Sequence, residues 1–542
     1  MIKRIAPLII LFTFICSASF AGLTPEQRVN DAQMIVDLFE HRYGPMPWKE
    51  EFLGIDPAAM AENFLAHAET SQNDEDFYSS IAFYLAGLAD VHVQLTIPST
   101  GTAWLGFDTD DIDGDVIITF IDRYELPQNV FPFEVGDRVV SMDGFPVDDL
   151  RQELLLYRTV GMPRSDARTS AQALTWRKQD TYPIMPSGIS SLTIAPRNGT
   201  IEQTVDLPWI QSGFALAPVT THFGSAKAVQ VSRPKTFLEH IRIIEPTFYQ
   251  QRNARIGKDG EPFFDPWPSF KTIENSPVVA GTFRMDKKKI GYIRFDSFWV
   301  SYSQVLSTLS FLQDQIPAFQ RDTDALVIDI TDNGGGDICY GEEIASFFLR
   351  KPIEGVKLRA RPTRIWTTEI ESIIDLDGVQ NERAILEDIH GKVKVALAAG
   401  HRLTDPFRIC QPFENLPPAS TTYTKPILVL VNEFCASTAD AFPALLQDAG
   451  VAKIFGWRTR GAGGNVRPVG PFGNSDIRIS ITESLMWREK PVDLGEGRTT
   501  NYIENVGVVP DYPYDVTLDD FLNGYKGYRA AIETALRDML KR

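Results

Sequence analysis

Cysteine is scarce in this chain, with four residues in 542. Cys16 lies in the apolar amino-terminal segment, which leaves Cys339, Cys410 and Cys435 in the rest of the chain. Three cysteines cannot form a disulfide framework, and at most one pair among them can form. The sequence also contains no CxxC pair and no HExxH motif. We therefore expect no metal site and no cofactor.

Basic residues and long apolar runs are also in short supply. The chain has 71 acidic residues against 53 lysines and arginines, and its formal net charge is -18. Because a phosphate backbone binds to a basic surface, nucleic acid is excluded as a partner. After residue 15, no stretch approaches 18 uninterrupted apolar residues, so we expect no membrane insertion.

The amino-terminal segment has the pattern of a secretory signal peptide. Two basic residues precede an apolar stretch over residues 5–15, and small residues stand before a cleavage site predicted after Ala21. The apolar stretch is too short to span a membrane. We expect residues 1–21 to be removed and the mature protein to be secreted or periplasmic.

Residues 22–100 are predicted to form an amino-terminal helical domain that carries His92. Thr24 and Gln27 have the spacing of a capping box, and the helix that they begin should end near Gly44. A second helix is expected within "DEDFYSSIAFYLAGLAD", where apolar residues recur at helical spacing behind an acidic first turn.

The hydrophobic period then changes to two, which predicts a β-rich module over residues 101–215. Asp143-Gly144 is typical of a tight hairpin, and a short helix should begin at Val147. Residues 216–282 combine helical pieces with a charged run rich in glycine and proline, which indicates a linker. From residue 283 to 542, apolar strands alternate with helices at about 302–316, 340–350 and 438–448. This alternation is typical of an α/β fold.

Two loops that follow buried strands carry residues suited to catalysis. "NEFCASTADAF" places Ser437 at the start of a helix, where the helix dipole and the N–H of Thr438 can stabilise an oxyanion. "DITDNGGGD" presents Gly335 and Gly336, whose N–H groups can approach a substrate closely because no Cβ intervenes. Since such sheets bind ligands at the carboxyl ends of their strands, the two loops form a candidate site.

Each feature also has a purely structural interpretation. Ser437 and Asp440 fit a capping box, and most serines at helix starts only cap. The glycine run alone is more often a plain turn. His92 alone is more often a hydrogen-bonded structural residue than a base.

The order of motifs is more specific than any one of them. "ALVIDITDNGGGD", "PILVLVNEFCASTADAFPALLQDAG" and "IENVGVVPD" together resemble the tricorn and carboxyl-terminal-processing serine peptidases over about residues 285–515. The resemblance implies a ClpP/crotonase-like α/β peptidase core, with Ser437 as the nucleophile, and a PDZ-like module. Cys435 stands where these peptidases have the first serine of a Ser-Ala-Ser triplet.

The chain departs from the processing peptidases at the general base. Their lysine lies some 25 residues after the serine, where this chain has Ala462 in "RGAGG". The tricorn branch takes its base from an amino-terminal histidine that a late glutamate orients. On this pattern "LADVHVQL" supplies His92 and "YIENVGVVPD" supplies Glu504, with Glu496 in "DLGEGR" as the alternative orienting acid.

The resemblance therefore implies a secreted serine endopeptidase that cleaves polypeptides through an acyl-enzyme. Its triad would be Ser437, His92 and Glu504, and its oxyanion donors would be the N–H groups of Gly335, Gly336 and Thr438. Residues 216–282 would be a linker or an inhibitory segment that the enzyme itself cuts, as in a member of the tricorn branch. The alternatives are an inactive binding protein on the same core and a scaffold whose PDZ-like module gathers the C-termini of partners. The oligomeric state, including a homodimer, is left open.

Overall fold

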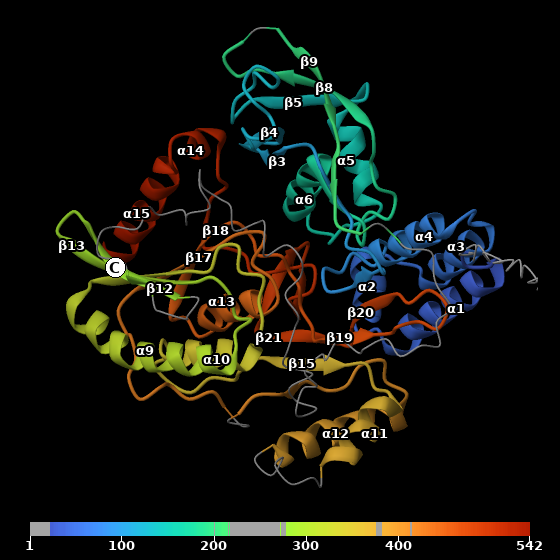
Figure 1. The fold of residues 1–542 in the computed structure, drawn as a ribbon. Coiled ribbons are helices and arrows are strands. Elements are labelled where there is room, and N and C mark those ends of the chain that lie inside the picture. The colour runs from blue at the N-terminus through green and yellow to red at the C-terminus, as the bar shows by residue number, and fades with distance from the viewer. Residues whose placement is uncertain are drawn as a thin grey trace, which may run out of the picture.

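The computed structural model describes residues 22–199, 201–214, 216, 271–272, 278–374, 382–411 and 415–541. The predicted signal peptide, residues 1–21, lies outside these ranges, as does nearly all of the predicted linker or inhibitory segment, residues 216–282. None of the described helices is long and apolar enough to cross a membrane. Figure 1 shows an amino-terminal group of helices, a module with its own sheet, and an α/β core.

The amino-terminal part consists of helices, as predicted. They are α1 (Pro25–Arg42), α2 (Met46–Leu53), α3 (Pro57–Thr70) and α4 (Asp74–Ala86). The predicted capping box is present, because the Thr24 side chain accepts the N–H of Gln27 and the Gln27 side chain accepts the N–H of Thr24. Three acidic residues in the first turn of α4 suit the positive end of its dipole.

The module contains an antiparallel sheet and two helices. Its elements are β2 (Thr102–Trp104), β3 (Phe107–Ile112), β4 (Asp115–Ile121), β5 (Arg138–Met142), β6 (Phe145–Pro146), β7 (Trp176–Lys178), β8 (Ile189–Ala195), β9 (Gln203–Pro208), β10 (Ile210–Ser212), α5 (Val147–Leu155) and α6 (Pro163–Thr175). The main sheet has the order β3-β4-β5-β8-β9, with β6 paired to β5, and β2 lies between β7 and β10 in a smaller sheet. The predicted hairpin and the helix from Val147 are confirmed, and Asp143 and Gly144 both have positive φ.

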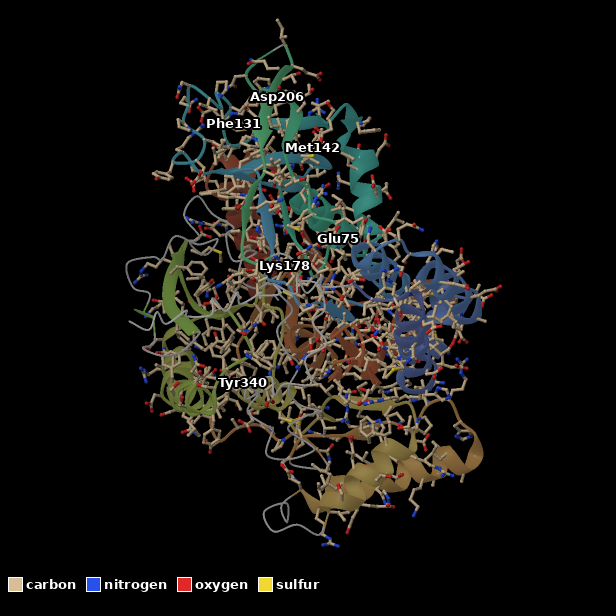
Figure 2. The ribbon with its side chains drawn as sticks, turned by 45° about the vertical axis from the view of Figure 1, so that its right-hand side comes forward. Glu75, Phe131, Met142, Lys178, Asp206 and Tyr340 are labelled. Atoms are coloured by element: carbon tan, nitrogen blue, oxygen red, sulfur yellow. A yellow bond between two sulfur atoms is a disulfide. The ribbon has the colours of Figure 1, made fainter. Side chains whose placement is uncertain are left out.

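Helix α6 was not anticipated, because its sequence shows no apolar stripe. Its buried positions are mostly small or polar, with Ser165, Thr169 and Ala171 among them. The buried Phe131 and Met142 belong to an apolar cluster of the module, whereas Tyr340 belongs to the largest cluster of the core (Figure 2). The module and the core therefore have separate apolar centres.

The core is built on a seven-stranded sheet of order β11-β12-β13-β14-β17-β18-β23, in which β13 to β23 run parallel. Its strands are β11 (Lys271–Thr272), β12 (Val278–Met285), β13 (Lys288–Phe295), β14 (Ala325–Asp329), β17 (Ile427–Val431), β18 (Ala452–Gly456) and β23 (Tyr512–Pro513). The helices against it are α9 (Tyr302–Asp322), α10 (Ile338–Ser346), α13 (Thr438–Asp448), α14 (Leu518–Leu522) and α15 (Lys526–Lys541). Successive residues of β17 belong to clusters on opposite faces of the sheet, which explains its uninterrupted apolar run.

Helix α9 is predicted to end at about residue 316, and the next residue is Pro317. It continues to Asp322, and the buried Phe319 shows that packing against the sheet outweighs the lost backbone hydrogen bond. The predicted core boundary at residue 283 falls inside β12, which is paired with β13 along its whole length.

The remaining elements of the core form a second sheet and a helical hairpin. They are β15 (Lys357–Ala360), β16 (Phe407–Arg408), β21 (Ser484–Gly495), β22 (Arg498–Tyr502), α11 (Arg364–Ile373) and α12 (Arg383–Ala399). Cys339 and Cys410 form a disulfide, whereas Cys435 is a free, buried thiol. This agrees with the limit of one pair set by the composition.

The amino-terminal helices and the core share structure. Strand β1 (Gln94–Thr96) pairs with β20 (Arg478–Thr482), which also pairs with β19 (Val466–Val469). Figure 1 shows β19 and β20 beside α1 and α2. Gly44 lies so close to the core that a Cβ there would be 2.4 Å from the carbonyl carbon of Glu483. Its N–H donates to the carbonyl oxygen of Thr482 at 2.9 Å. The turn that carries His92 is thereby held against the core.

Candidate active site

Ser437 stands between the end of β17 and the start of α13, in an unusual backbone conformation. Its φ is 60° and its ψ is -118°, which is a strained region for a residue other than glycine. Asp440 supplies its half of a capping box, because it accepts the Ser437 N–H at Oδ2 at 2.7 Å, whereas the Asp440 N–H donates to the Ser437 carbonyl oxygen at 2.8 Å. The Ser437 Oγ, however, forms no hydrogen bond with any described residue. The interpretation of this serine as only a cap therefore does not account for its hydroxyl group.

Asp440 holds the loop at residues 460–464 against the start of α13. Its carboxylate accepts the N–H groups of Gly461 and Ala462, both at 2.9 Å. Burial raises the pKa of Asp440 to about 6. Ala462, at the position of the processing peptidases' lysine, is fully buried in an apolar cluster with Val91 and Ala436. Ala462 therefore provides no amine at this position of the sequence.

The glycine loop after β14 packs directly on the serine. Gly335 has a φ of 98°, and a Cβ at this position would lie 2.7 Å from the Ser437 Cβ, so only glycine fits. The Gly335 N–H donates to Asn333 Oδ1 at 2.9 Å, so it is already engaged. The Thr438 hydroxyl donates to the Gly336 carbonyl oxygen at 2.7 Å. In the described part of the chain, the N–H groups of Gly336 and Thr438 form no hydrogen bond.

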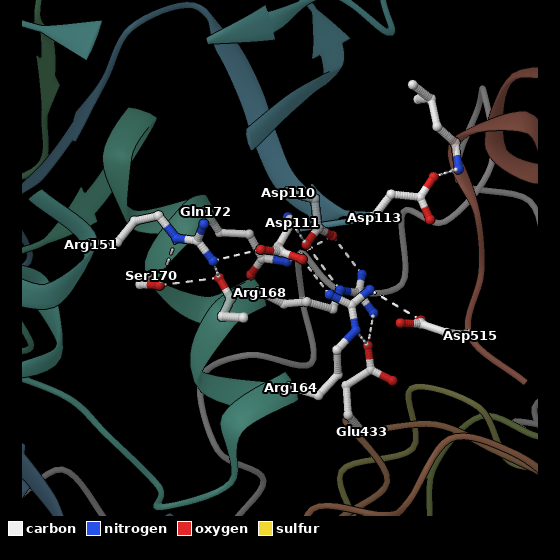
Figure 3. A network of polar contacts seen from close by, with 12 residues as sticks. Asp110, Asp111, Asp113, Arg151, Arg164, Arg168, Ser170, Gln172, Glu433 and Asp515 are labelled. Carbon is white, nitrogen blue, oxygen red and sulfur yellow. Dashed lines mark hydrogen bonds and ion pairs between the residues drawn. The ribbon is translucent and has the colours of Figure 1, made fainter. Parts of the chain in front are cut away.

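The module supports the same nucleophile loop from its other side. Arg168 on α6 pairs with Glu433 at 2.9 Å, and its guanidinium group stacks on the Phe434 ring. The Ser165 hydroxyl donates to the Glu433 carbonyl oxygen at 2.7 Å. Figure 3 shows Arg168 with its neighbours Arg164 and Asp110 in one network that reaches Glu433. The module is thus joined to the core four residues before Ser437.

His92 lies in the turn between α4 and β1. Its N–H donates to Asp90 Oδ1 at 2.9 Å, and its carbonyl oxygen accepts the Ser480 hydroxyl at 2.6 Å. The neighbours of His92 and Ser437 share one buried apolar cluster, which consists of Val91, Val160, Met162, Ala436 and Ala462. The structure therefore brings the His92 turn and the Ser437 turn together, although 345 positions of sequence separate the two residues. Among the described residues, neither ring nitrogen of His92 has a hydrogen-bond partner.

The surroundings of His92 favour the neutral imidazole. The residue is 2% exposed, and burial lowers its pKa to about 4. The nearby charges of Lys49, Arg460 and Arg158 lower this pKa further, and Asp90 opposes them. At neutral pH the ring is uncharged, which is the form that a general base needs.

Glu504 lies in the loop after β22 and has both carboxylate oxygens engaged. Oε1 accepts the Lys49 ammonium group at 2.5 Å, and Oε2 accepts the Gly463 N–H at 2.8 Å. Burial raises the pKa of Glu504 to about 7, Asp90 adds to this effect, and Lys49 opposes it. No hydrogen bond joins Glu504 to His92, although both residues are described.

Glu496, the alternative orienting acid, lies in the turn of a hairpin. It is exposed between β21 and β22, with a φ of 54°, whereas His92 is buried. Among the described residues, the Glu496 carboxylate forms no hydrogen bond or ion pair with His92.

Three buried groups beside the predicted triad escaped the sequence reasoning. Asp90 contacts the His92 backbone and accepts the Tyr43 hydroxyl at 2.8 Å, and Lys49 contacts Glu504. Lys49 and Tyr43 belong to "RYGPMPWKEEFLG", and Asp90 precedes His92 by two positions. Two signals were available in the sequence. One is a lysine that follows Met46, Pro47 and Trp48 in a short helix, and the other is a second acid beside the histidine.

The profiles of two known families match parts of the chain. The profile of peptidase family S41 matches residues 289–514, and that of the PDZ domain matches residues 101–213. Residues 289–514 are therefore similar to the peptidases of family S41. A stretch of the chain is also 27% identical to a carboxyl-terminal-processing protease of Picosynechococcus sp., over 193 residues that cover 35% of this chain and 34% of that protein.

Two longer matches place the S41 core in a larger architecture. A protein of Chlamydia trachomatis serovar D is 24% identical over 609 aligned residues, which cover 97% of this chain and 95% of the relative. The crystal structure of mature CPAF, the chlamydial protease-like activity factor, superposes with a TM-score of 0.75 at 23% identity, covering 95% of this chain and 98% of that one. At this identity the likeness shows the fold. The predicted architecture, an S41 peptidase core with a PDZ domain and amino-terminal helices, is confirmed.

Proposed function

We propose that the protein is a secreted serine endopeptidase with Ser437 as nucleophile, His92 as general base and Glu504 as the acid that supports His92. The observation that carries this proposal is the Ser437 hydroxyl, which has no hydrogen-bond partner among the described residues and sits on a strained turn at the start of α13. A hydroxyl group left unpaired in a buried site is costly unless another group uses it. The substrates would be polypeptides, as the S41 core indicates.

Each part of acyl transfer would be assigned to a named group of the candidate site. Neutral His92 would take the Ser437 proton as the hydroxyl attacks the peptide carbonyl, and would later give it to the leaving amine. The N–H groups of Gly336 and Thr438 would bind the oxyanion, with Gly335 keeping the loop close to the serine. The charge of Glu504 would stabilise the imidazolium that forms. Water would then release the acyl group in the second half of the reaction.

Labelling with a fluorophosphonate probe tests the nucleophile. We expect wild-type protein to be labelled and Ser437→Ala not to be labelled. Ser372→Ala serves as the matched control, because Ser372 lies exposed on α11, where its hydroxyl donates to the Glu369 carbonyl oxygen. Equal labelling of wild type and Ser437→Ala would exclude Ser437 as the reactive serine.

The intact chain would be a precursor that processes itself. Ser437 is 0% exposed and His92 is 2% exposed, so a polypeptide reaches the serine only after the site opens. The predicted cleavage region, residues 216–282, lies outside the described residues. Incubation of purified protein and measurement of intact mass test the hypothesis: wild type should fall into two fragments, while Ser437→Ala stays whole. Fully active protein that remains one chain would contradict it.

A catalytically inactive binding protein is the second candidate. The absence of hydrogen bonds between Ser437, His92 and Glu504 favours it, as does Ala462 at the position of the processing peptidases' lysine. Hydrolysis of an unstructured protein such as casein by wild type, and its loss in Ser437→Ala, would exclude this candidate. A homodimer stays a prediction, which light scattering of the purified protein would test.

A further inference from the structure

The most completely satisfied buried charge near the candidate site is the ammonium group of Lys49. Lys49 lies on α2 and is 0% exposed. Its three hydrogens have three acceptors: Glu504 Oε1 at 2.5 Å, Asn505 Oδ1 at 2.7 Å and the Ala89 carbonyl oxygen at 2.9 Å. An ammonium group has no further donor, so every direction in which Lys49 can bond is used.

The three acceptors come from two parts of the molecule that must meet for catalysis. Ala89 belongs to the turn that carries His92, whereas Glu504 and Asn505 belong to the late loop of the core. Asn505 reinforces the junction, because its side-chain amide donates to the Ala89 carbonyl oxygen at 2.9 Å and to the Val160 carbonyl oxygen at 3.0 Å. Lys49 of α2 therefore binds the histidine turn and the late loop at one point, and Asn505 extends this junction to Val160 of the module.

The neighbouring residue on α2 acts on the same loop. The Trp48 ring N–H donates to the Glu504 carbonyl oxygen at 2.9 Å, so α2 holds the backbone of Glu504 as well as its carboxylate. A buried, fully hydrogen-bonded ion pair can often be replaced by apolar residues without loss of stability, so such a pair is weak evidence of a stabilising role. The position of Lys49 thus suits the precise placement of Glu504.

We propose that Lys49 is a positioning residue of the active site, which joins the His92 turn to the Glu504 loop and holds the Glu504 carboxylate in place. This inference rests on the proposed function and deepens it. It explains how a base from the amino-terminal helices and an acid from the core are kept in register, and it gives α2 a role in catalysis without contact with substrate.

The protonation of His92 provides a readout that a merely structural role would not move. The charged groups that act on this ring are Asp90, Lys49, Arg460 and Arg158. Because a nearby positive charge disfavours the imidazolium, Lys49→Met should raise the pKa of His92 by about one unit. NMR titration of histidine-labelled full-length protein measures this pKa. All variants carry Ser437→Ala as the background, and the spectrum of His92→Gln assigns the signal.

Arg42→Met is the matched control for this titration. Arg42 on α1 also links the amino-terminal helices to the core, through an ion pair with Glu483 at 2.5 Å. It is not among the charges that act on His92. We expect the pKa of His92 in Arg42→Met to equal the pKa of His92 in the Ser437→Ala background. No shift in Lys49→Met, or an equal shift in Arg42→Met, would overturn the proposal, whether or not the protein proves to be a peptidase.

Kinetics separate the positioning role from the charge. Lys49→Met should lower kcat about 100-fold, the cost of a small misplacement of catalytic groups, with little change in KM. Lys49→Arg keeps the charge but not the geometry, so His92 should titrate normally while kcat still falls. Full kcat in Lys49→Arg would contradict positioning, even if Lys49→Met fails to fold. The proposed function is tested separately, by the loss of fluorophosphonate labelling in Ser437→Ala. Failure of the proposed function is therefore distinguishable from failure of the positioning role.

Discussion

The two halves of the candidate site are built in different ways. The nucleophile half lies within the core: Ser437 is held by Asp440 of its own helix and packs on Gly335 from the adjacent parallel strand. The histidine half depends on docking: His92 is held through Asp90 beside it and Ser480 of a core strand, and its ring has no hydrogen-bond partner among the described residues. The comparison teaches that the serine is preformed by the sheet, whereas the base is placed by an interface.

The two halves also differ in the energetic cost of losing a contact. The Ser437 turn is shaped by Asp440 of its own helix and by the glycine loop, which the parallel pairing of β14 with β17 brings beside it. The contacts that place His92 and Glu504 are buried polar groups from distant segments, which are costly if one partner is lost. We therefore expect changes in the histidine half to affect stability and catalysis together, and changes at Ser437 to affect catalysis alone.

The largest effect should come from the nucleophile. Ser437→Ala should reduce kcat by a factor on the order of a million, as removal of a catalytic serine does elsewhere. Because the Ser437 Oγ makes no hydrogen bond, the melting temperature should hardly change. Calorimetry beside a peptidase assay checks both. A clear fall in the melting temperature would show that the Ser437 hydroxyl also stabilises the fold.

Removal of the base should come next. His92→Ala should lower kcat by about three to five powers of ten, because the serine is then a weak nucleophile and Ala462 offers no substitute base. The fold should survive, since only the backbone of His92 is hydrogen-bonded. Near-normal turnover in His92→Ala, measured on the same substrate as wild type, would remove His92 from the mechanism.

The sequence predicted the nucleophile half more completely than the histidine half, for a physical reason. The turn at Ser437 and the glycine loop are set by residues within a few positions, and the parallel order of β14 and β17 brings them together. The placement of Glu504 depends on Lys49, which lies 455 positions away and has no local signature. Helix α6 was missed because its buried face is small and polar, so its sequence shows no apolar stripe.

An intermediate effect is expected at the orienting acid. Glu504→Gln should lower kcat by about 100-fold or more, because the imidazolium loses a stabilising charge. It should also destabilise the protein by about 3–5 kcal/mol, because the buried Lys49 ammonium loses its counter-ion. Denaturant unfolding and steady-state kinetics measure the two effects.

Glu496→Gln is the matched control for that carboxylate. Glu496 is exposed at a hairpin end, so kcat should be unchanged and stability should stay within about 0.5 kcal/mol. Reversed outcomes for Glu504→Gln and Glu496→Gln would assign the orienting role to Glu496 and break the comparison between the two halves.

The smallest effect is the shape of the pH profile. Burial lowers the pKa of His92 to about 4, so protonation of the ring should inhibit only below about pH 5. Burial raises the pKa of Glu504 to about 7, so the charge that supports the imidazolium is lost as pH falls through 7. We therefore expect kcat/KM to decline on the acid side in two steps, the first near pH 7 as Glu504 loses its charge and the second below about pH 5 as His92 is protonated. In Glu504→Gln only the lower step should remain. A single step at the ordinary histidine value of about 6.5 in both proteins would show that His92 is not held in the buried, uncharged state that the interface imposes.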